Sequence, residues 1–215
     1  MSIALFDLDG TIVDSGPTIV TSATETLEAF GFPVPGMEQL RRFVGPPINI
    51  GIVDVLGVPE GLMVDFRTAY RARYTQRMLE APMYDGMEAL LRDLAESGWI
   101  IGLATSKRED MALALLDHHR LAPLFRVTAG ADVAELRADK ASVVERALRL
   151  FSDQGVDASE ALMVGDRAHD ILGARAHGLR GVYVTWGYGS DQDIDESRPF
   201  AVAENLTQLR QILGS

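Results

Sequence analysis

From Met87 onward, short apolar segments alternate with segments of helical periodicity. The short segments are typical of buried strands and lie at residues 99–104, 125–128, 161–164 and 181–184, and one more precedes them at residues 3–6. The helical ones lie at residues 87–96, 110–119, 142–150, 168–176 and 206–213. This alternation predicts a parallel sheet with helices on both faces. The expected fold class is therefore α/β, with a Rossmann-like parallel-sheet core.

The stretch between the first strand and Pro82 has a different pattern, with apolar positions at helical spacing in Ile19–Phe30 and Leu62–Leu79. Prolines divide it into several pieces, and it contains no convincing strand. We therefore predict a small α-helical domain over residues 14–80. It is inserted into an α/β core formed by residues 1–13 and 81–215.

Charge and composition exclude several classes of function. The chain has 31 acidic and 20 basic residues, a net charge of −11, and it has no cysteine. This charge repels nucleic-acid polymers and anionic membranes, and the lack of cysteine excludes disulfides and thiolate chemistry. No apolar run reaches the roughly 18 residues of a membrane span, and no leader pattern opens the chain. We expect a cytoplasmic protein without a membrane or nucleic-acid partner.

The first predicted strand ends in two aspartates, Asp7 and Asp9, which are followed by Gly10. Side chains in an extended segment repeat with a period of two, so both carboxylates point the same way. They repel each other unless a cation or a shared proton lies between them, while Gly10 permits a sharp turn. An ordinary Asp-Gly turn accounts for Asp9 and Gly10, but it leaves Asp7 unexplained.

Polar residues also follow three later segments of the predicted core. Thr105 and Ser106 end a strand and suit a phosphate oxygen at a helix start, although a plain helix cap is the alternative. Lys140 begins a helix, where the helix dipole disfavours a cation, so either a nearby anion or plain solvent exposure explains it. Asp166 and Asp170 lie one helical turn apart. They offer the oxygen ligands that Mg²⁺ prefers, although an N-cap and a surface aspartate are the alternative.

Together these segments resemble the sequence motifs of the haloacid dehalogenase superfamily, in particular its small-molecule phosphatases. FDLDGTIVDS is similar to the first motif, LATSK to the second, Lys140 to the third and VGDRAHD to the fourth. Asp139-Lys140-Ala141-Ser142 departs from the Lys-Pro-x-Pro of phosphoglycolate phosphatases. The segment ELRADKASVVERAL is more similar to nucleotidase- and pyrophosphatase-like members. The resemblance implies a phosphoglycolate phosphatase- or nucleotidase-like enzyme with a helical cap of the C1 type.

The resemblance also implies roles for individual residues. Asp7 would be the nucleophile that forms an aspartyl-phosphate, and Asp9 the general acid and base. The phosphate would be held by Gly10, Thr105, Ser106 and Lys140, the last of which would also neutralise the nucleophile. Mg²⁺ would be bound by Asp7, the Asp9 carbonyl, Asp166 and Asp170. In the predicted cap, the substrate-facing candidates are Arg41, Gly45 and Pro46.

The expected function is magnesium-dependent hydrolysis of a small phosphomonoester, such as phosphoglycolate or a 5′-nucleotide. A phosphosugar mutase on the same scaffold and a non-catalytic binding module remain alternatives. The presence of Asp9 favours phosphate esters over haloacids, because the dehalogenases lack this second aspartate. The acidic run Asp191–Glu196 is interpreted as a solvated loop. We expect a monomer or a homodimer.

Overall fold

The computed structural model describes residues 2–132 and 139–214 and contains a six-stranded sheet. All neighbouring strands are parallel, in the order β3-β2-β1-β4-β5-β6. The strands are β1 (Ile3–Phe6), β2 (Ile100–Arg108), β3 (Phe125–Ala131), β4 (Leu162–Gly165), β5 (Arg180–Val184) and β6 (Ala201–Ala203). The predicted α/β class with a Rossmann-like parallel sheet is confirmed.

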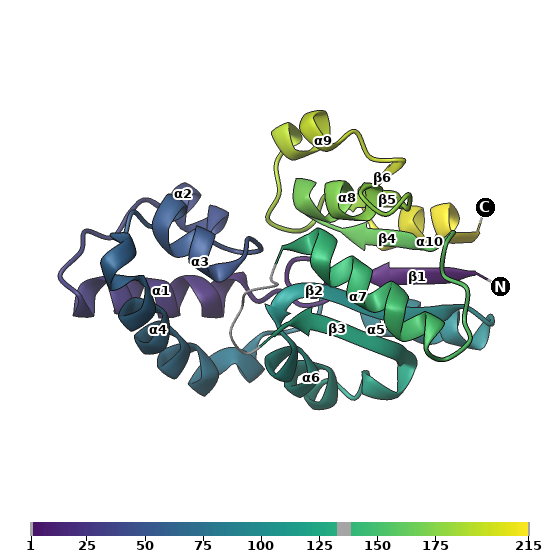
Figure 1. Cartoon of the computed structure of the whole chain (residues 1–215), viewed down its shortest axis with the longest axis horizontal. Coiled ribbons are helices and arrows are strands. Elements are labelled where there is room, and N and C mark those ends of the chain that lie inside the picture. Colours follow the sequence, from purple (N-terminus) through teal and green to yellow (C-terminus); the bar gives the residue numbers. More distant parts are fainter. Residues whose placement is uncertain (1, 133–138, 215) are drawn as a thin grey trace.

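Helices cover both faces of this sheet (Figure 1). The helices of the core are α5 (Met87–Glu96), α6 (Glu109–His118), η4 (Ala122–Leu124), α7 (Lys140–Ser152), α8 (Ala168–Arg175), α9 (Asp191–Ser197) and α10 (Leu206–Gly214). In β1, Ala4 and Phe6 pack with apolar residues of α5, α6 and α10. Ile3 and Leu5 point to the other face and pack with those of α7 and α8. This alternation follows from the pleat of a strand that is buried on both sides.

Residues 16–80 form a separate group of helices beside the core, here called the helical lobe (Figure 1). Its helices are α1 (Gly16–Ala29), α2 (Met37–Arg42), α3 (Ile48–Ile50), η1 (Gly51–Val55), η2 (Glu60–Leu62), α4 (Met63–Arg77) and η3 (Met78–Glu80). Aromatic pairs hold the lobe together: Phe30 meets Phe66 edge-on at 5.3 Å, and Phe43 meets Tyr70 at 5.5 Å. The lobe therefore has an apolar core of its own, which Met111 of α6 joins.

Two sequence-based expectations were wrong, and one strand was missed. The second core strand does not end at Ala104; β2 continues to Arg108, which pairs with Ala131 of β3 after a shift in register. The acidic run is not a loop but helix α9, which a capping box of Ser190 and Asp193 begins. The short edge strand β6 was not predicted. Residues Glu135–Ala138, the start of the segment similar to nucleotidases, lie outside the described residues.

The order of the strands fixes where a ligand site belongs. β2 and β3 lie on one side of β1, and the chain then crosses from β3 to β4 on its other side, so the strand order reverses between β1 and β4. In open α/β sheets, ligands bind at the carboxyl ends of the strands beside such a reversal. Asp7 follows β1 and Asp166 follows β4 at this edge. No helix among the described residues is long and apolar enough to cross a membrane.

Candidate active site

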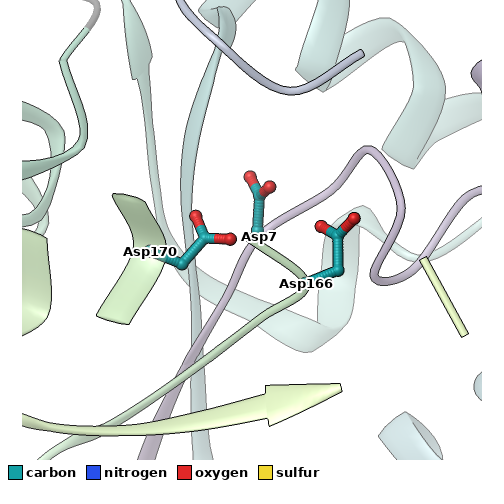
Figure 2. Close-up of side chains that lie close together, drawn as sticks. All are labelled: Asp7, Asp166 and Asp170. Atoms are coloured by element: carbon teal, nitrogen blue, oxygen red, sulfur yellow. The ribbon is translucent and has the colours of Figure 1, made fainter. Parts of the chain in front are cut away.

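Three aspartates gather at the carboxyl ends of β1 and β4 (Figure 2). Asp7 follows β1, Asp166 follows β4 and Asp170 lies in the first turn of α8. One carboxylate oxygen from each lies within 4.8 Å of the other two, and none of the three residues is more than 2% exposed. The structure thus brings together the acidic residues of the first and fourth motifs.

Lys140 lies against this acidic cluster. Its ammonium is 2.8 Å from Asp7 Oδ1 and 2.7 Å from Asp170 Oδ1, and it donates a hydrogen bond to the Ala104 carbonyl at 3.0 Å. Helix α8 passes close to Lys140 because residue 173 is glycine; a Cβ there would lie 2.8 Å from Lys140 Cβ. The anions expected from the placement of Lys140 at a helix start are therefore Asp7 and Asp170.

Burial and neighbouring charges shift the protonation of the cluster. Burial raises the pKa of Asp7 from 3.8 to about 6, although Lys140 acts in the opposite direction. Burial, together with Asp170 and Asp7, holds the pKa of Asp166 well above its usual value. For Asp170, burial raises the pKa, but Lys140 and His169 outweigh it and the net shift is downward. Burial likewise opposes the charged form of Lys140, but Asp170 and Asp7 raise its pKa.

Hydrogen bonds and glycines fix Asp166. Its Oδ1 accepts a hydrogen bond from Thr11 Oγ1 at 3.3 Å, and its Oδ2 accepts one from the Tyr188 backbone N–H at 2.7 Å. A Cβ at Gly10 or at Gly187 would overlap the Asp166 carboxylate. Gly10 also has φ +82°, a conformation that favours glycine. Both glycines are therefore needed for this carboxylate to reach the cluster.

This arrangement fits a divalent cation. Three buried carboxylates and the ammonium of Lys140 leave two negative charges, and uncompensated buried charge is costly. Carboxylate oxygens are the ligands that Mg²⁺ takes in proteins. Burial, and after it the neighbouring carboxylates, raise the pKa values of Asp7 and Asp166, so a bound cation would favour their ionised forms. The cluster is thus compatible with Mg²⁺.

Asp9 lies apart from the cluster and faces the helical lobe. Its Oδ1 accepts hydrogen bonds from Ser15 Oγ at 2.6 Å and from Lys107 Nζ at 2.9 Å, and its Oδ2 is 2.8 Å from Lys107 Nζ. Lys107 also donates to Tyr74 Oη of α4 at 2.6 Å. The side chain of Asp9 thus lies at the seam between core and lobe.

A small cavity of about 60 Å³ opens beside Asp9 at this seam. The lobe contributes Gly45, Pro46 and Tyr70 to its lining, and the core contributes Ser106 and Lys107. Two predicted specificity residues, Gly45 and Pro46, therefore lie at the cavity. Arg41 lies exposed on α2 and is not among the described residues that line it.

The second motif has a different geometry from the one expected. Thr105 is buried, and its hydroxyl accepts a hydrogen bond from the Lys107 backbone N–H at 3.2 Å. Both Thr105 and Ser106 belong to the extended end of β2, and helix α6 begins only at Glu109. The helix start predicted beside Thr105 and Ser106 is thus wrong, and both residues lie on an extended strand end instead.

Sequence reasoning missed Lys107, Tyr74 and Tyr188. Lys107 directly follows Thr105 and Ser106, so its position at a strand end was a usable signal. Tyr74 is one of the buried residues of α4, and what its hydroxyl contacts depends on how the lobe packs on the core. Tyr188 reaches Asp166 through its backbone and bonds to Asp14 and to the Gly16 N–H through its hydroxyl. No local pattern indicates these contacts.

The comparisons with known proteins agree on one family. The model of the haloacid dehalogenase-like hydrolases matches residues 4–184. A tyrosine-protein kinase, PtkA of Mycobacterium tuberculosis, is 37% identical over 99% of this chain and 72% of its own length. A 5′-nucleotidase of Pseudomonas aeruginosa is 31% identical over 98% of this chain and 95% of its own. A phosphoglycolate phosphatase 1 of the same species is 30% identical over 96% and 78%.

Solved structures agree with this family. The crystal structure of a predicted phosphatase from Clostridium acetobutylicum superposes with a TM-score of 0.91 at 29% identity, covering 100% of this chain and 99% of that one. The structure of Mycobacterium tuberculosis PtkA superposes with a TM-score of 0.85 at 36% identity, covering 100% and 98%. The likeness thus extends over the core and the helical lobe together.

Proposed function

The chain belongs to the haloacid dehalogenase-like hydrolase family, and we propose that it is a magnesium-dependent phosphatase of small phosphomonoesters with Asp7 as its nucleophile. One observation carries this proposal. Asp7 is paired with Lys140 inside a buried acidic cluster, while Asp9, two residues further on, faces the seam cavity. One carboxylate is thus positioned to attack phosphorus, and another is positioned to exchange protons at the leaving group.

The reaction divides into two steps at these two residues. A carboxylate oxygen of Asp7 attacks phosphorus, the bond to the ester oxygen breaks, and Asp9 gives a proton to the leaving alcohol. In the second step Asp9 takes a proton from a water molecule, which attacks the aspartyl-phosphate and releases inorganic phosphate and free Asp7. Gly10, Thr105, Ser106 and Lys140 are proposed to hold the phosphoryl oxygens, because such transfers depend on positioning and charge neutralisation.

Asp7, Asp166, Asp170 and the backbone carbonyl of Asp9 are the proposed Mg²⁺ ligands. When bound, the ion neutralises negative charge on the phosphoryl group and on the nucleophile. The residues themselves fix its place, since Thr11 and the Tyr188 N–H hold Asp166, and the Arg167 N–H donates to Asp170 Oδ2 at 3.0 Å.

We propose that the helical lobe is a cap with boundaries at residues 14 and 80. Both links to the core are tied together, because the Asp14 N–H donates to the Pro82 carbonyl at 2.8 Å. A cavity of about 60 Å³ is small for a phosphorylated metabolite, so entry of substrate requires the cap to move. We further propose that the enzyme acts in the cytoplasm on free metabolites, as a monomer or homodimer.

Two substrate types follow from the relatives, phosphoglycolate and 5′-nucleotides. A second candidate function is phosphoryl transfer to a protein tyrosine, because PtkA is 37% identical over nearly the whole chain. The two functions differ in the acceptor of the phosphoryl group, which is water in one case and a tyrosine hydroxyl in the other.

The test is a phosphate-release screen over about a hundred phosphorylated metabolites, with and without Mg²⁺, alongside Asp7→Asn. We expect Mg²⁺-dependent release from a small set of esters and its loss in the variant. A parallel arm supplies ATP and a tyrosine peptide and follows phosphotyrosine. Labelled peptide without phosphate release from esters favours the kinase. Release that survives Asp7→Asn contradicts the proposed nucleophile, and transfer of phosphate between positions of a sugar bisphosphate favours the mutase.

A further inference from the structure

The chain uses lysine at two positions only. Of its 20 basic residues, 18 are arginines, and the two lysines are Lys107 and Lys140. Each is paired with one carboxylate of the Asp7-Leu8-Asp9 motif: Lys140 with Asp7, and Lys107 with Asp9. The proposed mechanism gives a role to Lys140 but none to Lys107. A compact ammonium with three donors differs from the planar fork of arginine, so this selective use calls for a chemical explanation.

Lys107 joins the core to the helical lobe. Its Nζ contacts both oxygens of Asp9, donates to Tyr74 Oη at 2.6 Å and lies 4.7 Å from the centre of the Tyr74 ring. Burial, followed by the charge of Asp9, raises the pKa of Tyr74 well above its usual value, so this hydroxyl stays neutral. The negative charge that balances Lys107 in this contact is therefore that of Asp9.

The cavity beside Lys107 is cationic. Among the described residues that line it, three are basic, Arg71, Lys107 and Arg108, and one is acidic, Asp9. Burial lowers the pKa of Arg71 to about 10, and the nearby charge of Arg108 acts in the same direction. A cationic cavity in a chain of net charge −11 favours an anion beyond the phosphoryl group that the Asp7 cluster receives.

Resting on the proposed phosphatase function, we propose that Lys107 binds a second anionic group of the substrate, a carboxylate or a second phosphate, in exchange for Asp9. The exchange frees the Asp9 carboxylate, which Lys107 otherwise covers, to take up a proton from solvent and to face the leaving oxygen. Asp9 acts at that oxygen and lies 2.8 Å from Lys107, so the second anion belongs within a few bonds of the ester. The substrate class is small phosphomonoesters that carry a second anion close to the scissile bond.

The test compares substrates that differ only in the charge of the second group. 2-Phosphoglycolate carries a carboxylate, and 2-phosphoglycolamide carries a neutral amide of nearly the same shape. Ethylene glycol bisphosphate supplies a second phosphate instead. We expect kcat/KM for at least one of the two charged substrates to exceed that for the amide by about tenfold to a hundredfold, the usual effect of a charge-assisted hydrogen bond. The better charged substrate identifies the anion that Lys107 receives.

The variants are Lys107→Met and a control, Arg92→Met, which removes a cation that is bound to Glu88 and is not among the described residues that line the cavity. We expect the kcat/KM for the charged substrate, divided by the kcat/KM for the neutral amide, to fall to about one in Lys107→Met. In the control this ratio should change less than about threefold. The ratio separates recognition of the second anion from any effect on Asp9, which acts on all substrates alike. An equal loss on both substrates, with the ratio kept, means that Lys107 only positions Asp9 and overturns the proposal.

The affinity for the charged and neutral ligands can also be measured without turnover. In Asp7→Asn, calorimetry should show tighter binding of the charged ester than of the amide, and adding Lys107→Met should remove the difference. Equal binding of both ligands overturns the inference. If the wild type hydrolyses simple phosphomonoesters with Mg²⁺ but does not prefer the charged ones, the inference fails and the proposed function stands. If no phosphomonoester is hydrolysed while the charged ligand still binds through Lys107, the proposed function fails and the anion site stands.

Discussion

The site has two halves that are built differently. The half around Asp7, Lys140, Asp166 and Asp170 lies wholly in the core, and none of these residues is more than 3% exposed. The half around Asp9 lies at the seam, where Lys107 of the core meets Tyr74 of the helical lobe. The first half is assembled whatever the lobe does, whereas the second depends on where the lobe sits. We therefore expect substitutions in the Asp7 cluster and substitutions at the seam to have separable effects.

The two halves should differ most in how much stability and activity the protein loses when the lysine of each half is replaced. Lys140→Met leaves three buried carboxylates without their ammonium, and breaking such a pair costs about 3–5 kcal/mol. We also expect about a thousandfold loss of kcat, because charge stabilisation at phosphorus is lost. Lys107→Met should cost about 1–3 kcal/mol, since the Asp9 side chain is 11% exposed and keeps its hydrogen bond from Ser15. Urea unfolding and phosphate release measure both variants, and equal destabilisation would contradict the division.

The next substitution disturbs the core half without removing a charge. In Gly187→Ala the new methyl overlaps the Asp166 carboxylate and the Gly10 carbonyl, so Asp166 must leave the cluster. We expect at least about a tenfold weaker apparent affinity for Mg²⁺, the size of effect seen when groups that orient metal ligands are changed. Gly36→Ala is the control, because a Cβ there meets nothing within 4 Å. Unchanged Mg²⁺ activation in Gly187→Ala would contradict the assignment of Asp166 as a ligand.

The core half should also respond to pH. The pKa of Asp7 is raised from 3.8 to about 6, and that of Asp166 is also raised, so between these values the folded protein binds more protons than the unfolded chain. The stability of the metal-free protein should therefore fall as pH rises from about 4 to about 7. Mg²⁺ needs the ionised carboxylates, so it should raise Tm by about 5 °C more at pH 8 than at pH 5. Thermal unfolding at both pH values, with and without Mg²⁺, measures this difference, and an equal shift would show that these carboxylates do not hold the ion.

The core half could be predicted from sequence, and the physical reason is local. A buried apolar strand ends where its polar residues begin, and the carboxyl ends of neighbouring parallel strands meet at one edge. Asp7 and Asp166 therefore converge once β1 and β4 are placed side by side. Asp170 follows from the helical spacing, and Lys140 follows from its unfavourable place at a helix start, which needs nearby anions.

The seam half could not be predicted, because it depends on tertiary packing. Tyr74 is a buried residue of α4, and only the docking of the lobe on the core decides that its hydroxyl contacts Lys107. Helix α9 was missed for a similar reason. Its sequence is acidic and has little apolar periodicity, and it is held by a capping box and by Asp193, which accepts a hydrogen bond from the Ala168 N–H at 2.9 Å.

A smaller effect is expected from the lobe side of the seam. Tyr74→Phe keeps the ring but removes the hydroxyl that accepts from Lys107, and a lost buried hydrogen bond costs about 1 kcal/mol. We expect kcat/KM for 2-phosphoglycolate to fall about threefold to tenfold, with Mg²⁺ activation unchanged. Tyr70→Phe, on the ring stacked at 5.7 Å, is the control and should have less effect. A weakened response to Mg²⁺ in Tyr74→Phe would show that the two halves are coupled.

The smallest expected effect lies at Arg41, the specificity residue predicted from sequence. Its side chain is exposed on α2, and Gly45 and Pro46 line the cavity in the part of the chain that the structure describes. Arg41→Ala should therefore change kcat/KM by less than about twofold, as expected for a surface substitution. Gly45→Ala should do more, because Gly45 has φ +106° and a Cβ there would lie 3.2 Å from Arg167 Cγ. If Arg41→Ala instead lowers kcat/KM tenfold while Mg²⁺ activation is unchanged, the substrate extends beyond the seam cavity onto α2, and selection by the lobe involves more than the contacts of Lys107.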